Sequence, residues 1–340
     1  MRTRFLKAGR AATAAAALLT CATQAQAAKN DCDRACLDGV VNQYLAAMVA
    51  HDASKAPFAK KVKFTENATK LPLTEGLWFT AIGLTDYKIY VADPQQGAAA
   101  FIGLVQEHTA PPNPPRPVIL ALRLKVVNKQ ITEAEQIVAR TVRPTSVPNL
   151  QTPRAYISQA LAPEERSSRA DLIKITNLYF DGIEQETGSI VPFDPECNRL
   201  ENGMRTAGPP LPGQKGPAAT LVPPAGSQPM QPGAGPPPGF SAQQCIDGFN
   251  SGIFAYITAV QPRRVLVVDE ERGVTFGVFM FQHRGVTTVK MRDGSTRGAP
   301  FDGEPVTMPM AELFKIKSGK IRDVEAIGIR LPYGMSDGWE

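Results

Sequence analysis

The sequence contains few of the residues on which catalytic sites most often depend. It has three histidines, five cysteines and two tryptophans in 340 residues, and aromatic side chains make up 7%. A serine or cysteine triad would need one of the three histidines, and none of them stands in an H-x-H or H-E-x-x-H spacing. We find no G-x-S-x-G elbow, phosphate-binding loop or glycine-rich dinucleotide fingerprint. The sequence therefore predicts no bound cofactor and no metal.

Long apolar segments and an excess of one charge are also missing after the N-terminus. Residues 1–27 have a basic start, an alanine- and leucine-rich run and an A-x-A ending, which is the layout of a signal peptide. The run is too short to span a bilayer. Four of the five net positive charges lie in this segment, so the rest lacks the clustered basic charge that nucleic acid requires. We expect a secreted or periplasmic protein, with no membrane span and no nucleic-acid partner.

Cysteine is scarce, but the four cysteines that follow the signal segment form an even set. Cys32, Cys36, Cys197 and Cys245 predict two disulfides in an oxidising compartment. Because Cys32 and Cys36 are four residues apart at a helix start, we expect each to bridge Cys197 or Cys245. A four-cysteine zinc site is the alternative, although paired C-x2-C spacing is lacking. A lipoprotein signal ending at Cys21 is the alternative to cleavage after Ala27.

The two halves of the chain match each other at offsets of 135, 176 and 190 residues. The order of the matches indicates an internal duplication, with a first domain at 28–150 and a second at 160–334. The matched pairs include Tyr44–Tyr179, Ser54–Ser189, Glu66–Glu201, Asn67–Asn202, Trp78–Phe254, Asp93–Asp269, Glu107–His283 and Glu135–Glu325.

The second domain carries an insertion at 206–240 that the first domain lacks. Between residues 207 and 239, eighteen of thirty-three residues are proline or glycine. Such a segment cannot bury enough apolar surface to offset the entropy of ordering it, so we expect a disordered or polyproline-like loop. Recruitment of a partner by its prolines is the alternative.

The hydrophobic pattern predicts helices first and strands afterwards in each domain, which is an α+β fold with a curved antiparallel sheet packed on N-terminal helices. Ser54 or Ser189 is placed to cap a short second helix. The residues at 93–97 and 269–273 form turns between antiparallel strands. The expected helices are 40–50, 75–83, 172–183 and 250–260, and the expected strands of the first domain are 61–67, 87–93, 98–108, 118–127 and 130–140.

This order, headed by "YLAAMVAHDASKAPFAKKVKFTEN", resembles the SnoaL-like branch of the nuclear-transport-factor-2-like superfamily, which includes ketosteroid isomerases, scytalone dehydratase and polyketide cyclases. The resemblance implies that each domain is a cone around an apolar pocket. It also implies a tyrosine on the first helix that donates to a developing oxyanion, and a strand carboxylate that moves a proton. Tyr44 and Glu66 match these positions. The aspartate that completes the isomerase oxyanion hole has no match, which argues against steroid isomerisation.

We therefore predict Tyr44 and Glu66 as the catalytic pair, with His51 and Asp52 as an acid/base pair at the rim. The other reading is that the tyrosines are core aromatics and the Glu-Asn pairs hold turns. Arg199 beside Glu201 would form a salt bridge, so the second domain is the weaker catalytic candidate. The expected ligand-binding side chains are Phe64, Asn67, Trp78, Tyr179, Glu201 and Phe254.

The expected function is the binding of a small apolar or oxygenated molecule. The expected chemistry is proton transfer of the isomerase, dehydratase, lyase or epoxide-hydrolase type. A non-catalytic binding or assembly protein is the alternative, with the two domains packed on each other as a pseudo-dimer.

Overall fold

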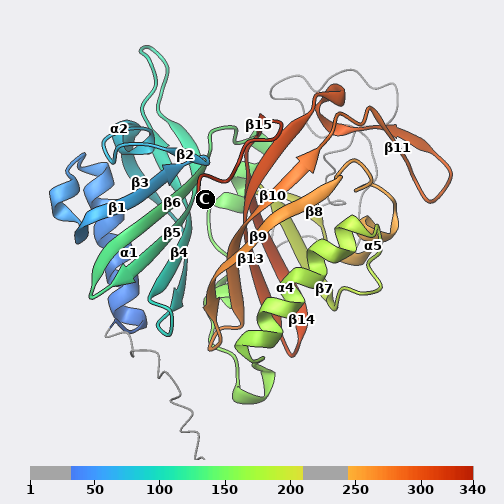
Figure 1. The fold of residues 1–340 in the computed structure, drawn as a ribbon, viewed down its shortest axis with the longest axis horizontal. Helices are drawn as coiled ribbons and strands as arrows, with labels where there is room; N and C mark the ends of the chain where they lie inside the picture. The colour runs from blue at the N-terminus through green and yellow to red at the C-terminus, as the bar shows by residue number, and fades with distance from the viewer. Residues whose placement is uncertain (1–31, 210–243, 340) are drawn as a thin grey trace, which may run out of the picture.

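The computed structural model describes residues 32–209 and 244–339. The predicted signal peptide and nearly all of the proline-rich insertion lie outside the described residues. The described chain is α+β and is dominated by two sheets (Figure 1). We call residues 34–139 unit 1 and residues 169–328 unit 2. Unit 1 contains α1 (Arg34–Val49), η1 (Ala53–Lys55), β1 (Phe58–Glu66), β2 (Thr69–Lys70), α2 (Leu77–Thr80), β3 (Ala81–Asp93), β4 (Ala98–Glu107), β5 (Arg116–Val127) and β6 (Gln130–Ala139).

A linker of short helical turns joins unit 1 to unit 2. Unit 2 repeats the order of the α-helices and sheet strands of unit 1, has turns where unit 1 has η1, and adds the small hairpin β11–β12 and the helical turn η4. The linker contains η2 (Pro144–Leu150), α3 (Ala155–Ser158) and η3 (Pro163–Glu165). Unit 2 and the residues after it contain α4 (Arg169–Glu184), β7 (Phe193–Glu201), β8 (Met204–Ala207), α5 (Cys245–Asn250), β9 (Ala259–Asp269), β10 (Val274–His283), β11 (Thr288–Lys290), β12 (Thr296–Gly298), η4 (Pro300–Gly303), β13 (Val306–Lys317), β14 (Lys320–Gly328) and β15 (Leu331–Pro332).

The two sheets have the same strand order, β2-β1-β6-β5-β4-β3 and β8-β7-β14-β13-β10-β9. The hairpin strands pair antiparallel, as the turn residues predict. However, β1 runs parallel to β6 and β7 runs parallel to β14, so the sheets are mixed. The prediction of wholly antiparallel sheets was wrong, because no short turn joins these two partners and the local sequence does not set their relative direction.

Two further predictions about helices need correction. The short helix η1 is capped by Asp52, whose carboxylate accepts from the backbone N–H of Ser54, and residues 185–192 form turns instead of a second helix. The segment 250–260 is not a helix, because Gly252 adopts a left-handed φ of 82° just after α5. The long helices predicted at 40–50 and 172–183 are present within α1 and α4.

The residues matched between the halves occupy equivalent positions in the sheets. In unit 1, Glu66 on β1 lies beside Gln136 on β6, which lies beside Leu122 on β5. In unit 2 the corresponding row runs from Glu201 on β7 through Ala326 on β14 to Glu312 on β13. The offsets of 135 and 190 therefore identify residues that face the same way in the two units.

Each unit buries one face of its sheet beneath its long helix. The core of unit 1 includes Tyr44 from α1 and Leu122 from β5, and that of unit 2 includes Tyr179 from α4 and Phe314 from β13. The remaining faces of the two sheets pack against each other, with the long helices on the outer sides (Figure 1). This central cluster includes Ile89, Val91, Ile102, Val267, Phe276 and Leu313.

Two equivalent ion pairs cross between the units. Arg34 at the start of α1 donates to Asp269 at 2.6 Å, and Arg169 at the start of α4 donates to Asp93 at 3.1 Å. Asp93 and Asp269 also accept backbone N–H groups in their own turns, as the sequence predicts. Each aspartate thus closes a β-turn and receives the first arginine of the other unit's long helix.

The segments that follow the two units also cross over in an equivalent way. After unit 1, Asn149 donates to the carbonyl of Gly203 in the β7–β8 turn at 2.7 Å. After unit 2, the indole N–H of Trp339 donates to Thr65 on β1 at 3.0 Å, and Lys63 lies 4.4 Å from the centre of the Trp339 ring. Each trailing segment therefore contacts the first strand or first turn of the other unit.

The disulfides join Cys32 to Cys36 and Cys197 to Cys245. The expectation that each N-terminal cysteine bridges to the second half was wrong. Cys32 precedes the N-cap residue Asp33 and lies outside α1, so its Cα comes within 5.1 Å of that of Cys36. Because all four cysteines are oxidised, they form no zinc site. Such disulfides are typical of oxidising compartments.

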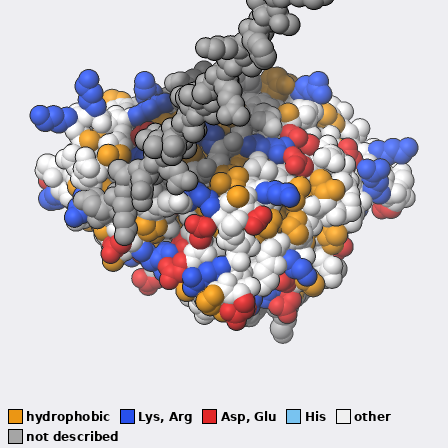
Figure 2. Space-filling model, turned by 60° about the horizontal axis from the view of Figure 1, so that its bottom comes forward, with side chains coloured by type: hydrophobic (Ala, Val, Ile, Leu, Met, Phe, Trp, Pro, Cys, Tyr) orange, Lys and Arg blue, Asp and Glu red, His pale blue; other side chains and the backbone are white. Residues whose placement is uncertain are grey.

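The surface shown in Figure 2 carries acidic and basic side chains interspersed with apolar ones. No helix among the described residues is both long and apolar enough to cross a membrane.

Candidate functional site

The residues predicted to be catalytic in unit 1 form a closed hydrogen-bond network. The Tyr44 hydroxyl donates to Gln136 Oε1 at 2.8 Å and accepts the indole N–H of Trp78 at 2.8 Å. Gln136 then donates to Glu66 Oε2 at 3.2 Å. All four residues are buried, and burial raises the pKa of the Tyr44 hydroxyl. A ligand that used this hydroxyl would have to displace a buried protein partner.

The Glu66 carboxylate is held by further partners. Its Oε2 accepts the backbone N–H of Leu77 at 2.7 Å, and its Oε1 pairs with Arg140 at 3.1 Å. Arg140 also pairs with Glu107, which receives Thr80 and Arg116 as well. These contacts make Glu66 an anchor for the start of α2 and the end of β6.

The other predicted residues of unit 1 have local structural contacts. His51 Nδ1 lies 2.7 Å from the carbonyl oxygen of Trp78, and Asp52 caps η1. Asn67 adopts a left-handed φ of 53°, and its side chain bonds the backbone of Val138. Asn202 repeats this contact with Gly328 in unit 2. The repeated Glu-Asn pair thus marks a turn that is tied to the last strand of each unit.

The same inner face has different residues in unit 2. The apolar Phe64 and Leu122 of unit 1 are replaced by charged residues, and the hydrogen-bonding Gln136 and Trp78 are replaced by residues without polar side-chain atoms. The pairs are Phe64–Arg199, Leu122–Glu312, Gln136–Ala326, Trp78–Phe254 and Glu107–His283. The inner face of unit 2 therefore has two ionisable residues, Arg199 and Glu312, at positions that are apolar in unit 1. It also lacks the hydrogen-bonding side chains that Gln136 and Trp78 supply in unit 1.

Arg199 lies on β7 and is buried. Its Nε donates to Thr206 at 2.9 Å and lies 3.1 Å from Glu201, as the sequence predicts for an arginine beside this glutamate. The guanidinium lies 5.0 Å from the centre of the Phe254 ring. Within the described residues, Arg199 Nη1 has no hydrogen-bond partner. The Tyr179 hydroxyl also interacts with the Arg199 guanidinium. A buried guanidinium N–H without an acceptor is costly, so a ligand or water at Nη1 would complete the hydrogen bonding of this side chain.

Glu312 lies on β13, on the same face as Met310 and Phe314, and is 1% exposed. No partner for its Oε2 atom occurs in the part of the chain that the structure describes. Burial and the nearby Glu201 raise the pKa of Glu312 well above its ordinary value, and Arg199 opposes this shift. The neutral carboxyl is therefore favoured, and its O–H can donate a hydrogen bond.

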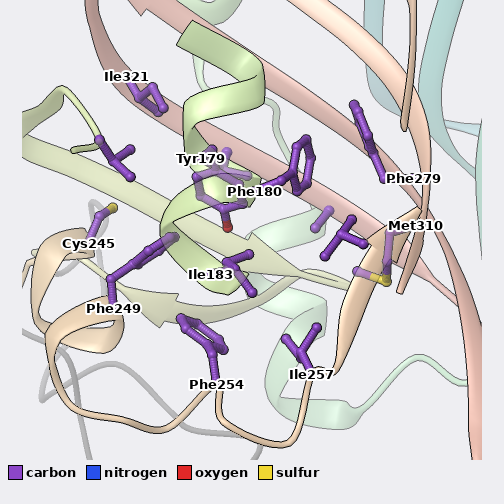
Figure 3. Close-up of a cluster of buried hydrophobic side chains, with 14 of the residues drawn as sticks. Tyr179, Phe180, Ile183, Cys245, Phe249, Phe254, Ile257, Phe279, Met310 and Ile321 are labelled. Atoms are coloured by element: carbon purple, nitrogen blue, oxygen red, sulfur yellow. The ribbon is translucent and has the colours of Figure 1, made fainter. Parts of the chain in front are cut away.

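Two tyrosines and several apolar side chains complete the interior of unit 2. Tyr179 on α4 directs its hydroxyl toward Ile183, Phe249 and Phe254 (Figure 3). Burial raises the pKa of Tyr179 and of Tyr256, so both phenols stay protonated at neutral pH. Figure 3 also shows Ile257 and Met310 beside this group. The interior is thus a largely apolar core, in which the Tyr179 ring lies 5.0 Å from the rings of Phe249 and Phe314, and it contains a few polar groups.

The sequence prediction placed Tyr179, Glu201 and Phe254 in this region but did not identify Glu312 as a site residue. It treated Arg199 as a structural partner and His283 as a strand-end residue. The available signal was the difference between matched positions. Leu122 opposite Glu312 and Phe64 opposite Arg199 are changes from apolar to charged at positions that face a core.

Comparison with known proteins gives no function. A family model described as a domain of unknown function, DUF8021, matches residues 165–328, a range that spans unit 2 and the four residues before it. No curated protein matches. Among solved structures, the chain is similar to AclR, a putative hydroxylase from Streptomyces galilaeus, with 16% identity over 36% of this chain and 89% of that chain, and a TM-score of 0.28.

Proposed function

We propose that the protein binds a small, largely apolar ligand in the interior of unit 2, through an uncharged acceptor oxygen such as a carbonyl. The observation that carries this proposal is that two polar atoms, Arg199 Nη1 and Glu312 Oε2, have no hydrogen-bond partner among the described residues of a largely apolar core. Native cores rarely leave such atoms unpaired, and unpaired atoms of this kind point to a ligand or ordered water.

The charges of this interior favour a neutral ligand. The guanidinium of Arg199 is already paired with Glu201, and the burial of Glu312 favours its neutral form. A carboxylate ligand would add a negative charge beside Glu201 without a free counter-charge. A carbonyl oxygen can instead accept from both Arg199 and Glu312 without a change in net charge.

The proposal also covers the fold of each half and the way in which the two halves pack together. We infer a SnoaL-like cone in each half, supported by the shared strand order and by the long helix on each sheet. The two halves act as a pseudo-dimer, supported by the equivalent pairs Arg34–Asp269 and Arg169–Asp93. Export to an oxidising compartment is supported by two disulfides together with the signal-like residues 1–27. Unit 1, with its closed network, serves as the structural half.

Proton-transfer catalysis is a second candidate function, favoured by two carboxyl groups with different surroundings in one interior. Glu201 accepts from Thr206 at 3.1 Å and pairs with Arg199, whereas burial favours the neutral form of Glu312. A salt-bridged carboxylate and a buried neutral carboxyl group in one interior are typical of acid/base pairs. Glu201 would remove a proton from the carbon next to the carbonyl, and Arg199 and Glu312 would stabilise the resulting enolate oxygen.

Binding is tested by isothermal titration calorimetry with biphenyl that carries one para-acetyl group. We expect Glu312→Leu, which installs the residue found in unit 1, to weaken binding about tenfold, since it removes one donor. Glu312→Gln keeps a donor of similar shape and should bind nearly as well as the unchanged protein. Equal binding by the Leu variant would contradict the proposal.

Catalysis is tested by following the acetyl protons of the same compound by NMR in D2O. Exchange for deuterium that depends on Glu201, and that is lost in Glu201→Gln, would support an enzyme. Binding without such exchange would leave a binding protein.

A further inference from the structure

His283 is a buried histidine at the end of β10, on the face that looks into unit 2. It is 5% exposed, and neither ring nitrogen has a hydrogen-bond partner within residues 32–209 and 244–339. The Tyr256 ring stacks on it with centroids 5.1 Å apart, and the Phe301 ring meets it edge-on at 5.1 Å. Burial lowers the pKa of His283 to about 4. At neutral pH the ring therefore has one N–H donor and one acceptor nitrogen.

At the matched position in unit 1, the buried residue is Glu107, and its carboxylate is fully hydrogen-bonded. It bonds three side chains, Thr80, Arg116 and Arg140. In unit 2 the counterparts of Thr80 and Arg116 are Tyr256, whose ring stacks on His283, and Val306, its strand partner. Within the described residues, neither gives a hydrogen bond to the ring nitrogens of His283. The rings of Tyr256 and Phe301 cover the His283 ring without hydrogen-bonding to its nitrogens. Both nitrogens therefore keep their capacity to form hydrogen bonds.

The segment that covers His283 is strained. Phe301 has φ 65° and ψ 20°, and Asp302 has φ 52° and ψ 30°, so two consecutive residues other than glycine adopt the left-handed conformation. This costs about 1–2 kcal/mol for each residue and is rare for phenylalanine. The contacts of the Phe301 ring with His283 and with the Arg330 guanidinium, at 5.3 Å, hold the segment in place. Strain of this kind is concentrated at ligand-binding segments.

The strand register places His283 at a distance from the first group of polar residues. Gly277 on β10 pairs with Glu312, and His283 follows six residues later on the same strand. Six residues span about 20 Å along an extended strand. Side chains on the inner face between these two points are apolar, including Phe279, Phe281 and Met310. The interior of unit 2 therefore has one polar group of residues near each end of an apolar wall.

We propose that His283 is a second binding subsite, which takes a hydroxyl group at the far end of an elongated ligand, with Phe301 as its cover. This inference rests on the proposed function, because the other end of the ligand is held by Arg199 and Glu312. A hydroxyl group both donates and accepts, which matches the two nitrogens of a neutral imidazole. The ligand class is thus a rigid, uncharged and mostly apolar molecule with a carbonyl at one end and a hydroxyl at the other.

The test compares two para-terphenyls, which are long enough to span about 20 Å with a hydrogen bond at each end, by calorimetry on the full chain and on two variants. One compound carries a para-acetyl group on one terminal ring and a para-hydroxyl group on the other terminal ring, and the second carries the acetyl group alone. In the unchanged protein we expect the hydroxyl group to strengthen binding about tenfold, the effect of one buried hydrogen bond. His283→Phe should abolish this preference and leave the affinity for the acetyl compound unchanged. His283→Gln, which keeps a donor and an acceptor, should retain much of the preference.

The outcomes separate the two proposals. A hydroxyl preference that survives in His283→Phe, or that is missing in the unchanged protein while the acetyl compound binds, would overturn the subsite and leave the proposed function standing. Failure of both compounds to bind the unchanged protein would contradict the proposed function itself.

Discussion

At the scale of residues, the two units differ by a few changes at matched positions. In unit 1, Tyr44, Trp78, Gln136 and Glu66 satisfy one another. In unit 2 the counterparts of Trp78 and Gln136 are Phe254 and Ala326, so the hydrogen bonds they would supply are lost. Natural proteins accept a locally unfavourable arrangement mainly at functional sites, which makes the inner face of unit 2 the candidate.

Glu312 should make the stability of the protein fall as pH rises. Its pKa in the native state lies above the ordinary value of 4.5, so the native state retains a proton that the unfolded state has lost. The native state is therefore favoured below about pH 4.5 and loses this advantage as pH rises toward the native pKa. Glu312→Gln cannot lose a proton and should be more stable than the unchanged protein by about 1–3 kcal/mol at about pH 8. Urea unfolding at both pH values measures this difference, and parallel pH profiles would contradict it.

His283 should have the opposite pH dependence. Its native pKa of about 4 lies below the ordinary value of 6.5, so the unfolded state binds a proton first. Stability is fully present above about pH 6.5 and falls by up to about 3 kcal/mol as pH drops through 6.5 toward about 4. His283→Phe should remove this loss. The check is the change in unfolding free energy between these pH values, with Glu312→Gln as a background in which the other titration is absent.

Glu312 and His283 could not be identified as site residues from the sequence of one repeat alone. Glu312 stands in "MAELFKIK", where alternation alone does not show which face is buried, and its burial depends on α4 and β14 packing around it. Tyr179 and Glu201 were found because the duplication pointed to them. The comparison that would have found Glu312 and Arg199 is a search of the duplication for differences between the halves.

At the scale of elements, α5 connects the disulfide to the candidate site. Cys245 begins this helix and is bonded to Cys197 on β7, two residues before Arg199. The helix also carries Phe249, which packs on Phe254 at 5.2 Å between ring centroids. The Cys197–Cys245 bond thus fixes one wall of the interior against the strand that carries Arg199.

Replacing Gly248 in α5 with alanine would add a methyl group beside Arg199 and Phe254 without disrupting the helix. A Cβ atom there would lie 3.7 Å from Phe254 and 3.8 Å from both terminal nitrogens of Arg199, which is ordinary contact. Because alanine favours a helix over glycine by about 1 kcal/mol, Gly248→Ala should keep or raise the unfolding free energy. It should also weaken binding of the acetyl biphenyl, since the new methyl group lies beside the donor. Thermal unfolding and calorimetry on the same sample check both parts, and unchanged affinity would place the ligand elsewhere.

The elements themselves were predictable where the pattern was long and regular. The helical spacing at 40–50 and 172–183 and the four strands from 87 to 140 agree with α1, α4 and β3 to β6. The prediction failed at short elements such as 250–260, where Gly252 ends α5 and the apolar run forms turns. It also failed for the parallel pairs β1–β6 and β7–β14, because partners far apart in sequence leave no local signal of direction.

At the scale of the whole molecule, equivalent contacts hold the two units together. Arg34 pairs with Asp269 and Arg169 pairs with Asp93, and both aspartates are almost fully buried. An arrangement in which the same two positions meet twice is the hallmark of a two-fold interface.

Removal of either arginine should destabilise the protein to a similar degree. Arg34→Ala leaves the buried Asp269 without its cation, and Arg169→Ala does the same to Asp93. Because the arginines are about one quarter exposed, water partly screens each pair, and we expect a loss of about 1–3 kcal/mol for each variant. Lys55→Ala, which breaks an exposed pair with Asp52, is the matched control and should change the unfolding free energy by less than about 0.5 kcal/mol. Urea unfolding measures all three, and strongly unequal losses for the two arginines would argue against equivalent roles.

The most direct test of the account is methyl NMR of the protein with labelled methionines, because methionines lie in the cores of both units. Met310 lies on the inner face of unit 2 near Glu312, and Met48 lies in the core of unit 1. Titration with the acetyl biphenyl should shift the Met310 methyl signal and leave the Met48 signal unchanged, and Glu312→Leu should reduce the Met310 shift at equal ligand concentration. A shift of Met48 without one of Met310 would contradict the assignment of the ligand site to unit 2.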